Sequence, residues 1–214
     1  MATIHLNKVV PNFLEKENWQ RSEVWNRQIS IRQGQKVQII APSGSGKTSL
    51  IHFLYGLRKD YNGYILYDDQ PLASFTKTDL AILRKDKLSI VFQDLRLFAN
   101  HTVLENIEIK NTLAPYHQPN QIKSMAEALG IGNKLSQKAG ICSYGEQQRI
   151  AIIRSLQQPF TCLILDEPFS HLDDENSEKA MHLILAEAEA RGAAIILADL
   201  RPGPSFKADV TYHL

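Results

Sequence analysis

Ala41-Pro42-Ser43-Gly44-Ser45-Gly46-Lys47-Thr48 is the stretch of this sequence that decides the fold. The apolar run Val37–Ile40 precedes it, and a helical pattern over Thr48–Leu57 follows it. A glycine-rich turn that ends in Lys-Thr between a strand and a helix is typical of a loop that binds nucleotide phosphates. Glycines let backbone N–H groups approach phosphate oxygens, and the helix N-terminus adds positive potential. Ala41 replaces the first glycine of the usual pattern, which is compatible with the loop if φ stays negative there.

The side chains of this loop have separate expected roles. We expect Lys47 to reach the β- and γ-phosphates of ATP, and the Thr48 hydroxyl to bind Mg²⁺. An ordinary strand-to-helix turn with chance glycines does not account for the order of strand, loop, Lys-Thr and helix. The predicted phosphate contacts are Ser43, Gly44, Ser45, Gly46, Lys47, Thr48 and Ser49.

A second apolar stretch, Leu163-Ile164-Leu165-Asp166-Glu167, ends in two carboxylates. The carboxyl end of a buried parallel strand faces the ligand crevice, so these carboxylates are predicted to lie near the phosphates. Asp166 is then a candidate to hold Mg²⁺, and Glu167 is a candidate general base for the attacking water. An acidic surface turn after a strand is the alternative, and the upstream phosphate-binding loop makes it the weaker interpretation.

Length and composition narrow the class of protein. The chain has 214 residues, 43% of them hydrophobic and 22% charged, which is typical of a globular protein with its own core. A formal net charge of +1 gives no indication of a nucleic-acid partner. The N-terminus carries no signal-peptide pattern, and no apolar run approaches 18 residues. Cys142 and Cys162 lack metal-ligand or redox spacing, so we expect reduced core thiols.

Strands alternate with helices along most of the chain, which predicts an α/β fold with a mostly parallel sheet covered on both faces. Residues 1–214 are interpreted as a single domain, with a helical lobe over about 95–150. Short antiparallel strands are expected near the N-terminus. The predicted strands are Thr3–Val9, Gln28–Ile31, Val37–Ile40, Leu88–Phe92, Cys162–Leu165 and Ala193–Ala198, with a final short strand at the C-terminus; the further predicted helices are Glu146–Leu156 and Glu178–Arg191.

Several further motifs resemble those of the ATP-binding cassette family. Ser143-Tyr144-Gly145-Glu146-Gln147-Gln148-Arg149 resembles the family signature, and it lies about twenty residues before Asp166. Gln93 resembles the glutamine of the Q-loop, and His171-Leu172-Asp173 resembles the D-loop. The resemblance covers nearly the whole chain. It implies a P-loop NTPase core with an N-terminal antiparallel β subdomain and a helical signature subdomain.

This resemblance implies specific ligand contacts. Gln93 is expected to contact ATP and Mg²⁺, and Phe13 is a candidate for stacking on adenine, with Trp19 a weaker one. A head-to-tail dimer is also implied, in which Ser143, Gly145 and Glu146 of one subunit face the ATP of the other. Ser143 and Glu146 also form a capping-box pattern, so a purely structural role as a helix cap is an alternative. Both roles can hold together.

Two departures from the family pattern concern hydrolysis. Tyr144 replaces the first signature glycine, and Ala198-Asp199 stands where the resemblance implies a switch histidine followed by aspartate. Alanine cannot donate a hydrogen bond to the γ-phosphate, and loss of one such donor commonly slows a reaction by about two to three orders of magnitude. We therefore expect ATP binding with slow hydrolysis. Compensation by His171 is an alternative.

The segment Asp94–Ile107 resembles the subfamily that serves lipoprotein release, macrolide efflux and cell division. This implies an integral membrane permease as partner and a cytoplasmic location on the inner face of the membrane. Leu97 and Phe98 are candidates to contact the permease, or else core residues of the helical lobe.

Two functions are therefore compared: an ATPase subunit that drives or gates a permease, and a nucleotide-dependent regulatory module with little turnover. Chromosome-type cassettes carry long coiled coils that this sequence lacks. The sequence leaves the choice between a homodimer and a heterodimer open.

Overall fold

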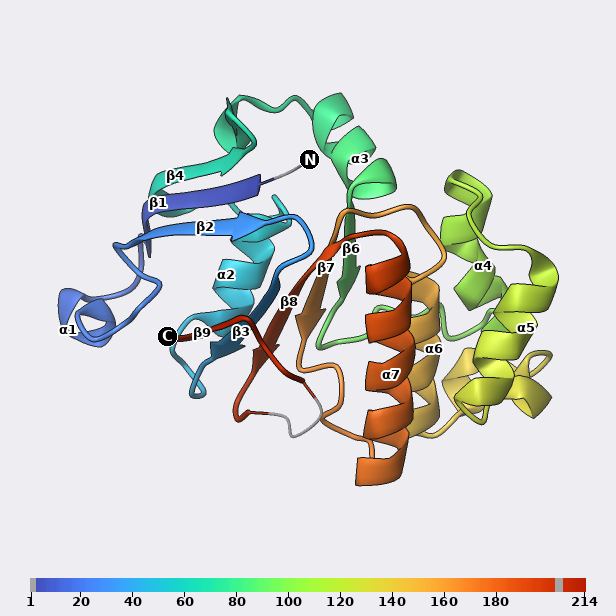
Figure 1. Cartoon of the computed structure of the whole chain (residues 1–214). Coiled ribbons are helices and arrows are strands. Elements are labelled where there is room, and N and C mark those ends of the chain that lie inside the picture. The colour runs from blue at the N-terminus through green and yellow to red at the C-terminus, as the bar shows by residue number, and fades with distance from the viewer. Residues whose placement is uncertain (1–2, 203–205) are drawn as a thin grey trace.

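The computed structural model describes residues 3–202 and 206–214 and contains two sheets with helices packed around them (Figure 1). The larger sheet is fully parallel, with strand order β6-β7-β8-β3-β9. Its strands are nearly all apolar, as expected for strands that are covered on both faces. Their bounds are β3 Lys36–Ile40, β6 Leu88–Val91, β7 Cys162–Asp166, β8 Ala194–Asp199 and β9 Val210–His213.

The second sheet is antiparallel and is formed mainly by the first 70 residues, with strand order β2-β1-β4-β5. Buried and more exposed residues alternate along β2, so one face of the sheet packs on the core and the other faces solvent. The bounds are β1 Thr3–Pro11, β2 Gln28–Arg32, β4 Tyr61–Tyr67 and β5 Gln70–Pro71.

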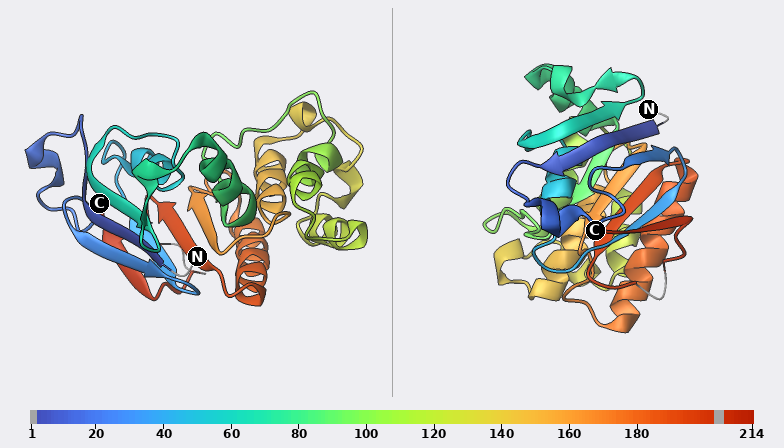
Figure 2. Two further views of the ribbon diagram at one scale, coloured as in Figure 1. Left: turned by 90° about the horizontal axis from the view of Figure 1, so that it is seen from above. Right: turned by 90° about the vertical axis from the view of Figure 1, so that its left-hand side faces the viewer.

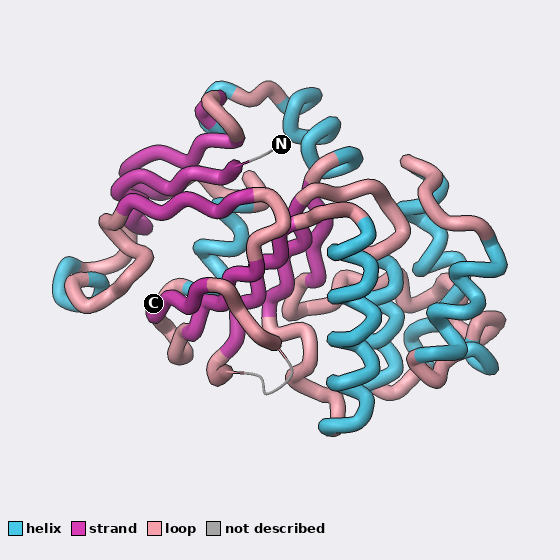
Figure 3. The backbone as a smooth tube through the Cα atoms, in the orientation of Figure 1, coloured by secondary structure: helices cyan, strands magenta, loops and turns pink. Residues whose placement is uncertain are grey.

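The helices complete three layers (Figures 1 and 2). Helix α2, Lys47–Leu54, lies between the two sheets, while α6, Tyr144–Ser155, and α7, Asp174–Ala190, cover the other face of the parallel sheet. Helices α4 and α5 project beyond α6 as a helical lobe, at the far end from the antiparallel sheet (Figures 2 and 3). The other helices are α1 Lys16–Trp19, α3 Lys77–Asp86, α4 Val103–Leu113 and α5 Pro119–Ala128, with 3₁₀ turns at Leu72–Ser74, Gly132–Lys134 and Ala139–Ile141.

The predicted α/β fold with a parallel sheet, an antiparallel subdomain and a helical lobe is confirmed, but several bounds differ. Helix α2 ends at Leu54 rather than Leu57, because Gly56 adopts a positive φ. Helix α7 begins at Asp174, four residues before the prediction, because the Asp173 side chain accepts the N–H of Asn176 as an N-cap.

Two hydrophobic cores hold these layers together. One fills the space between the sheets around α2, and the other lies beneath α6, α7 and the helical lobe. Within the described ranges, no helix has the length and apolar character that crossing a bilayer requires.

Candidate functional site

A cavity of about 430 Å³ opens where the carboxyl ends of the parallel strands meet the N-terminus of α2. Ligands of open parallel sheets bind in this position. Its lining comes from five separate parts of the chain: Phe13, the loop and helix residues Pro42, Ser43, Gly44, Gly46, Lys47, Thr48 and Ser49, then Gln93, Glu167 and Leu200. Most of the phosphate-binding residues predicted from the sequence therefore lie together. Ser45 does not line the cavity, and its hydroxyl donates to the Pro42 carbonyl at 2.8 Å.

The glycine-rich loop has a backbone conformation that its sequence makes accessible. Gly46 is the N-cap of α2 with φ of +92°, and a Cβ there would lie 3.1 Å from the Trp25 ring. The Trp25 indole N–H donates to the Ser45 carbonyl at 3.1 Å, and the side chain is almost fully buried. Sequence reasoning missed this support, because nothing local pairs a tryptophan with a turn twenty residues away. Ala41, the departure from the glycine pattern, keeps a negative φ.

Lys47 and Glu167 form a buried ion pair at the floor of the cavity. Burial lowers the pKa of Lys47, while the negative charges of Asp166 and Asp199 oppose that shift. Glu167 follows β7 directly and has a φ of +47°, and its backbone N–H donates to the Ala198 carbonyl at 2.9 Å. This uncommon conformation for a non-glycine residue turns the carboxylate from the strand end toward the phosphate-binding loop.

Asp166 is the last residue of β7 and lies behind the cavity lining. Burial raises the pKa of Asp166 to about 6, with the nearby Lys47 charge acting in the opposite direction. Its Oδ1 atom is buried and has no hydrogen-bond partner among the described residues. A buried carboxylate oxygen without a partner is energetically costly, so this position is suited to a cation or an ordered water.

The Thr48 hydroxyl faces Gln93, which follows β6, with 3.5 Å between the Thr48 Oγ1 and Gln93 Oε1 atoms. Thr48 and Gln93 both line the cavity. Together with Asp166 they bring three oxygen ligands of the kind that Mg²⁺ prefers to one edge of the sheet.

Phe13 lines the mouth of the cavity, and 53% of its surface is exposed. It sits in the turn after β1, where the Leu14 N–H donates to the Pro11 carbonyl. Trp19, the weaker aromatic candidate, packs against the core and does not line the cavity.

Ala198, where the resemblance implies a switch histidine, is placed by the structure at the end of the parallel sheet. Strand β8 extends to Asp199, so Ala198 lies inside the parallel ladder between Ile39 and Asp166 and is fully buried. The residue of this segment that lines the cavity is Leu200, two positions later on the chain, with 46% of its surface exposed. Neither Ala198 nor Leu200 carries a side-chain hydrogen-bond donor, so the absence of a histidine expected from the sequence applies to both positions.

The signature residues lie at the start of α6 and do not line the cavity. Ser143 and Glu146 form the predicted capping box, with the Ser143 N–H donating to the Glu146 carboxylate at 2.8 Å. Gly145 has no room for a side chain, because a Cβ would lie 2.9 Å from the His171 carbonyl oxygen. Within one subunit, the signature and the phosphate-binding loop are separate surfaces.

Gln148 connects helix α6 to Glu167 at the end of β7, a connection that sequence reasoning missed. Its buried amide donates to the Glu167 carbonyl at 3.1 Å and accepts the His171 N–H at 3.0 Å. The His171 ring packs edge-on against Tyr144, with 4.2 Å between the ring centroids. His171 does not line the cavity of its own subunit.

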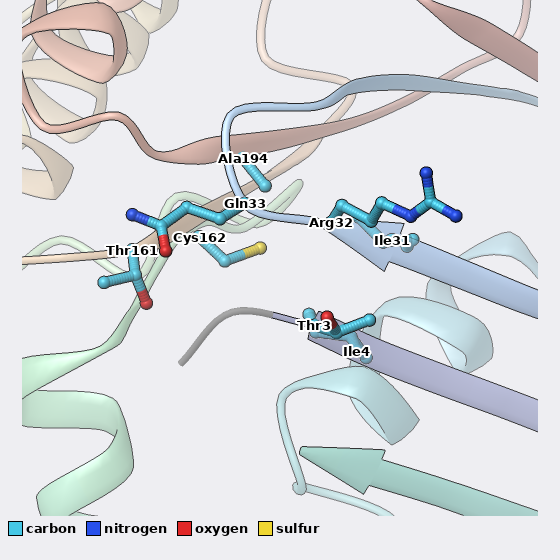
Figure 4. Close-up of a pocket in the computed structure, with 8 residues that line it drawn as sticks. All are labelled: Thr3, Ile4, Ile31, Arg32, Gln33, Thr161, Cys162 and Ala194. Atoms are coloured by element: carbon cyan, nitrogen blue, oxygen red, sulfur yellow. The ribbon is translucent and has the colours of Figure 1, made fainter. Parts of the chain in front are cut away.

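A second, much smaller cavity of about 10 Å³ lies at the junction of the two sheets, near the amino ends of β7 and β8 (Figure 4). The Cys162 thiol borders it, and burial raises the pKa of Cys162 to about 12. Both cysteines are free and buried, as expected from the sequence. A neutral thiol in so small a space has no evident chemistry.

Comparison with known proteins decides the family. The family model described as "ABC transporter" matches residues 24–170. The chain belongs to the ABC transporter family. It is 36% identical over 172 residues to the lipoprotein-releasing system ATP-binding protein LolD of Syntrophotalea carbinolica, covering 79% of this chain and 76% of the relative. It is 37% identical over 159 residues to LolD of Buchnera aphidicola, covering 73% and 69%.

Solved ABC structures agree with this assignment. A dimeric bacterial ABC transporter cassette superposes with a TM-score of 0.79 at 26% identity, covering 92% of this chain and 88% of that one. A dimeric cassette bound to ADP and phosphate after hydrolysis gives a TM-score of 0.77 at 27% identity, with the same coverage. The chain is thus the ATP-binding, ATP-hydrolysing subunit of an ABC-type membrane complex, and the predicted resemblance to the lipoprotein-release branch is confirmed.

Proposed function

We propose that this ABC subunit binds ATP with its phosphate-binding loop, dimerises head to tail around the nucleotide, and drives or gates a separate permease. The observation that carries the proposal is the separation of two surfaces. The cavity gathers the phosphate-binding loop, Gln93 and Glu167, whereas the signature Ser143–Gly145 lies outside it. A second subunit is needed to bring the two surfaces together around one ATP.

Within the subunit, the backbone N–H groups of residues 43–49 and the Lys47 ammonium are the groups that hold the phosphates. Lys47 is paired with Glu167, so phosphate oxygens compete with that carboxylate for the ammonium group. When the phosphates take Lys47, Glu167 is free to accept a proton from the attacking water. The same ion pair therefore links phosphate binding to the general base.

The oxygen ligands fit a magnesium site. Thr48, Gln93 and Asp166 would hold the ion, and the orphaned Asp166 Oδ1 is the observation that supports it. Bound Mg²⁺ would neutralise charge on the β- and γ-phosphate oxygens. Asp166 also keeps its buried negative charge close to Lys47, which helps to fix the ammonium at the cavity floor.

Across the dimer, the N-terminus of α6 is the surface proposed to face the partner's ATP. Ser143, Gly145 and Glu146 stand there, and a helix N-terminus attracts anionic oxygens. Tyr144 adds a half-exposed ring at this surface, held by His171. We propose that this ring restricts the approach of the partner's phosphates.

Slow turnover is part of the proposal. Leu200 offers the cavity a hydrocarbon side chain and no hydrogen-bond donor. Without a donor from this side, neither the γ-phosphate nor the water is fixed from the end of β8. Nothing in the relatives supports the alternative of a regulatory module without turnover.

The proposed partner is an integral membrane permease, reached from the cytoplasmic face of the membrane. The relatives are named as ATP-binding proteins of lipoprotein-releasing systems. For this chain we propose a membrane complex without assigning its substrate. Beyond Gln93, the Phe98 side chain is 48% exposed whereas Leu97 is partly buried against the lobe core. Phe98 is therefore the stronger candidate for contact with the permease.

The test is the ATP dependence of assembly. Size-exclusion chromatography with light scattering should detect a dimer of the Glu167→Gln variant with ATP and Mg²⁺, and a monomer with ADP. The variant Ser143→Arg should abolish the dimer while ATP still binds. A dimer that forms equally without nucleotide, or that survives Ser143→Arg, would contradict the head-to-tail arrangement.

A further inference from the structure

Phe13, the proposed platform for adenine, is an exposed ring with one charged neighbour. The Arg58 guanidinium carbon lies 5.2 Å from the centroid of the Phe13 ring and 5.7 Å from that of the buried Phe53 ring. A guanidinium within about 6 Å of a ring centroid is attracted to the ring, and the attraction is stronger where the contact is shielded from water. Arg58 thus connects the exposed ring to the core.

Arg58 is held by Asp60 in its own loop and by Ser49 on helix α2. Its Nε atom donates to Asp60 Oδ1 at 2.9 Å, and a second nitrogen pairs with Asp60 Oδ2. The remaining terminal nitrogen donates to the Ser49 hydroxyl at 3.1 Å. Ser49 lies on α2 beside Thr48 and lines the cavity. The Asp60 carbonyl in turn accepts the N–H of Asn12, next to Phe13.

These contacts join the two ends of the nucleotide site. The Arg58 guanidinium contacts Phe13 in the loop after β1, Ser49 on helix α2, and Asp60, the residue before β4. Arg58 itself does not line the cavity, whereas Phe13 does. Arg58 thus contacts Phe13 at 5.2 Å without itself forming part of the lining.

We propose that Arg58 is a positioning residue for the nucleotide base: it braces Phe13 so that the cavity-facing side of the ring stacks on the purine. This rests on the proposed stacking of adenine on Phe13. Direct contact of Arg58 with phosphate is the weaker alternative, because Asp60 and Ser49 already engage all three of its nitrogens.

Binding of two ligands separates base recognition from phosphate recognition. Dissociation constants for ATP and for inorganic tripolyphosphate, each with Mg²⁺, are measured by calorimetry on the full chain. We expect Arg58→Met to weaken ATP binding roughly threefold to tenfold, since one cation–π contact and its bracing are lost. Tripolyphosphate binding should change less than twofold. Arg58→Lys should recover part of the loss, because it keeps the charge but not the paired hydrogen bonds.

A double-mutant cycle tests whether Arg58 affects ATP binding through Phe13. Phe13→Ala should lower the ATP-to-tripolyphosphate affinity ratio, and Arg58→Met in that background should lower it no further, because the two residues act as one unit. The matched control is Arg84→Met. Arg84 lies at the same 5.2 Å from an aromatic ring, that of Tyr55, but away from the cavity lining, so the ratio should stay unchanged.

Three outcomes overturn the inference, and they differ in what else they overturn. Equal weakening of both ligands by Arg58→Met would assign Arg58 to the phosphates or to folding. Additive effects of the two substitutions would show that Arg58 acts without Phe13. If Phe13→Ala itself leaves the ratio unchanged, the proposed stacking fails, and the role of Arg58 in it fails too, while ATP binding by the loop stands.

Discussion

The two sides of the phosphate cavity differ in the chemistry of the side chains that they contribute. The side built by α2, β6 and β7 presents an ammonium, a hydroxyl, an amide and a carboxylate, from Lys47, Thr48, Gln93 and Glu167. Among the described residues, the side at the end of β8 contributes Leu200 to the lining. One side can hold phosphates and accept a proton, and the other can do neither.

From this difference we infer that ATP binding and ATP hydrolysis depend on separate parts of the site. The groups proposed to bind phosphate all lie on one subunit, and the buried Trp25 holds the loop among them through the Ser45 carbonyl. The rate of ATP hydrolysis depends on hydrogen-bond donors that stabilise the transition state once the reacting atoms are enclosed. An ABC subunit can therefore keep its affinity for ATP while it loses speed. Each of the following experiments changes residues of the site and measures ATP affinity, ATP turnover or stability.

The largest expected effect is on the general base. Glu167→Gln removes the proton acceptor but keeps the shape of the side chain and a hydrogen-bond partner for Lys47. Steady-state ATP turnover should fall by about three orders of magnitude, while the dissociation constant for ATP changes only a few-fold. Phosphate release measured with a coupled assay gives the first quantity and calorimetry the second. Turnover within tenfold of the original protein would remove Glu167 from the chemistry.

Lys47→Ala should act on binding instead. It removes the charge proposed to contact two phosphates and leaves the largely buried Glu167 without its partner, so ATP affinity should fall by about two orders of magnitude. Lys77→Ala, on the exposed side of α3, is the matched change of charge and should leave affinity unchanged. Equal behaviour of the two variants would mean that the loop holds phosphate by its backbone alone.

The binding side of the cavity was easier to predict from sequence than the other side. A glycine-rich turn, a Lys-Thr pair and an Asp-Glu pair at a strand end are each short in sequence, so local rules locate them. The end of β8 is different, because sequence patterns place the end of an element only to within one or two residues, and no local motif marks Leu200. The sequence pattern predicts a strand that ends at Ala198, whereas strand β8 continues to Asp199.

Long-range contacts account for the other omissions. Trp25, Gln148 and Arg58 act through partners that only the tertiary fold brings near, so no spacing marks them. Helix α3 and strand β4 were not predicted either. For α3 a local signal existed, since Thr76 and Asp79 form a capping box that the sequence already contains. The seven-residue β4 has no regular alternation of buried and exposed residues along its first half.

The buried carboxylate should make stability depend on pH. The pKa of Asp166 is raised to about 6 from its ordinary value of 3.8, so the group is neutral in folded and unfolded chains below about pH 3. As pH rises, the unfolded chain loses this proton first, and the folded protein loses stability until the pH passes about 6. Asp166→Asn cannot ionise. Its free energy of unfolding relative to the original protein should therefore rise by about 1–2 kcal/mol between pH 5 and 7.5.

Urea unfolding with chelator and without nucleotide measures this difference at the two pH values. The exposed Asp69→Asn serves as control and should show the same difference at both. With Mg²⁺ and ATP present, the advantage of Asp166→Asn should shrink, because ligands that bind only the folded original protein stabilise it. A difference that is constant across pH would mean that Asp166 is not the group that titrates.

The smallest expected effect is an increase in ATP turnover, obtained by adding a hydrogen-bond donor at the end of β8. Leu200→His places an imidazole on the surface that lines the cavity, where it can donate to a phosphate oxygen, so turnover should rise about fivefold to tenfold with little change in ATP affinity. Ala198→His is the informative control, because that position is fully buried between Ile39 and Asp166. A histidine there overfills the ladder, so the expected result is lower stability and no gain in rate. If Ala198→His increases turnover and Leu200→His does not, the end of β8 is organised differently during catalysis. If neither does, the limit on rate lies with Tyr144 at the dimer surface, and the two sides of the cavity are not the comparison that decides the speed of this ATPase.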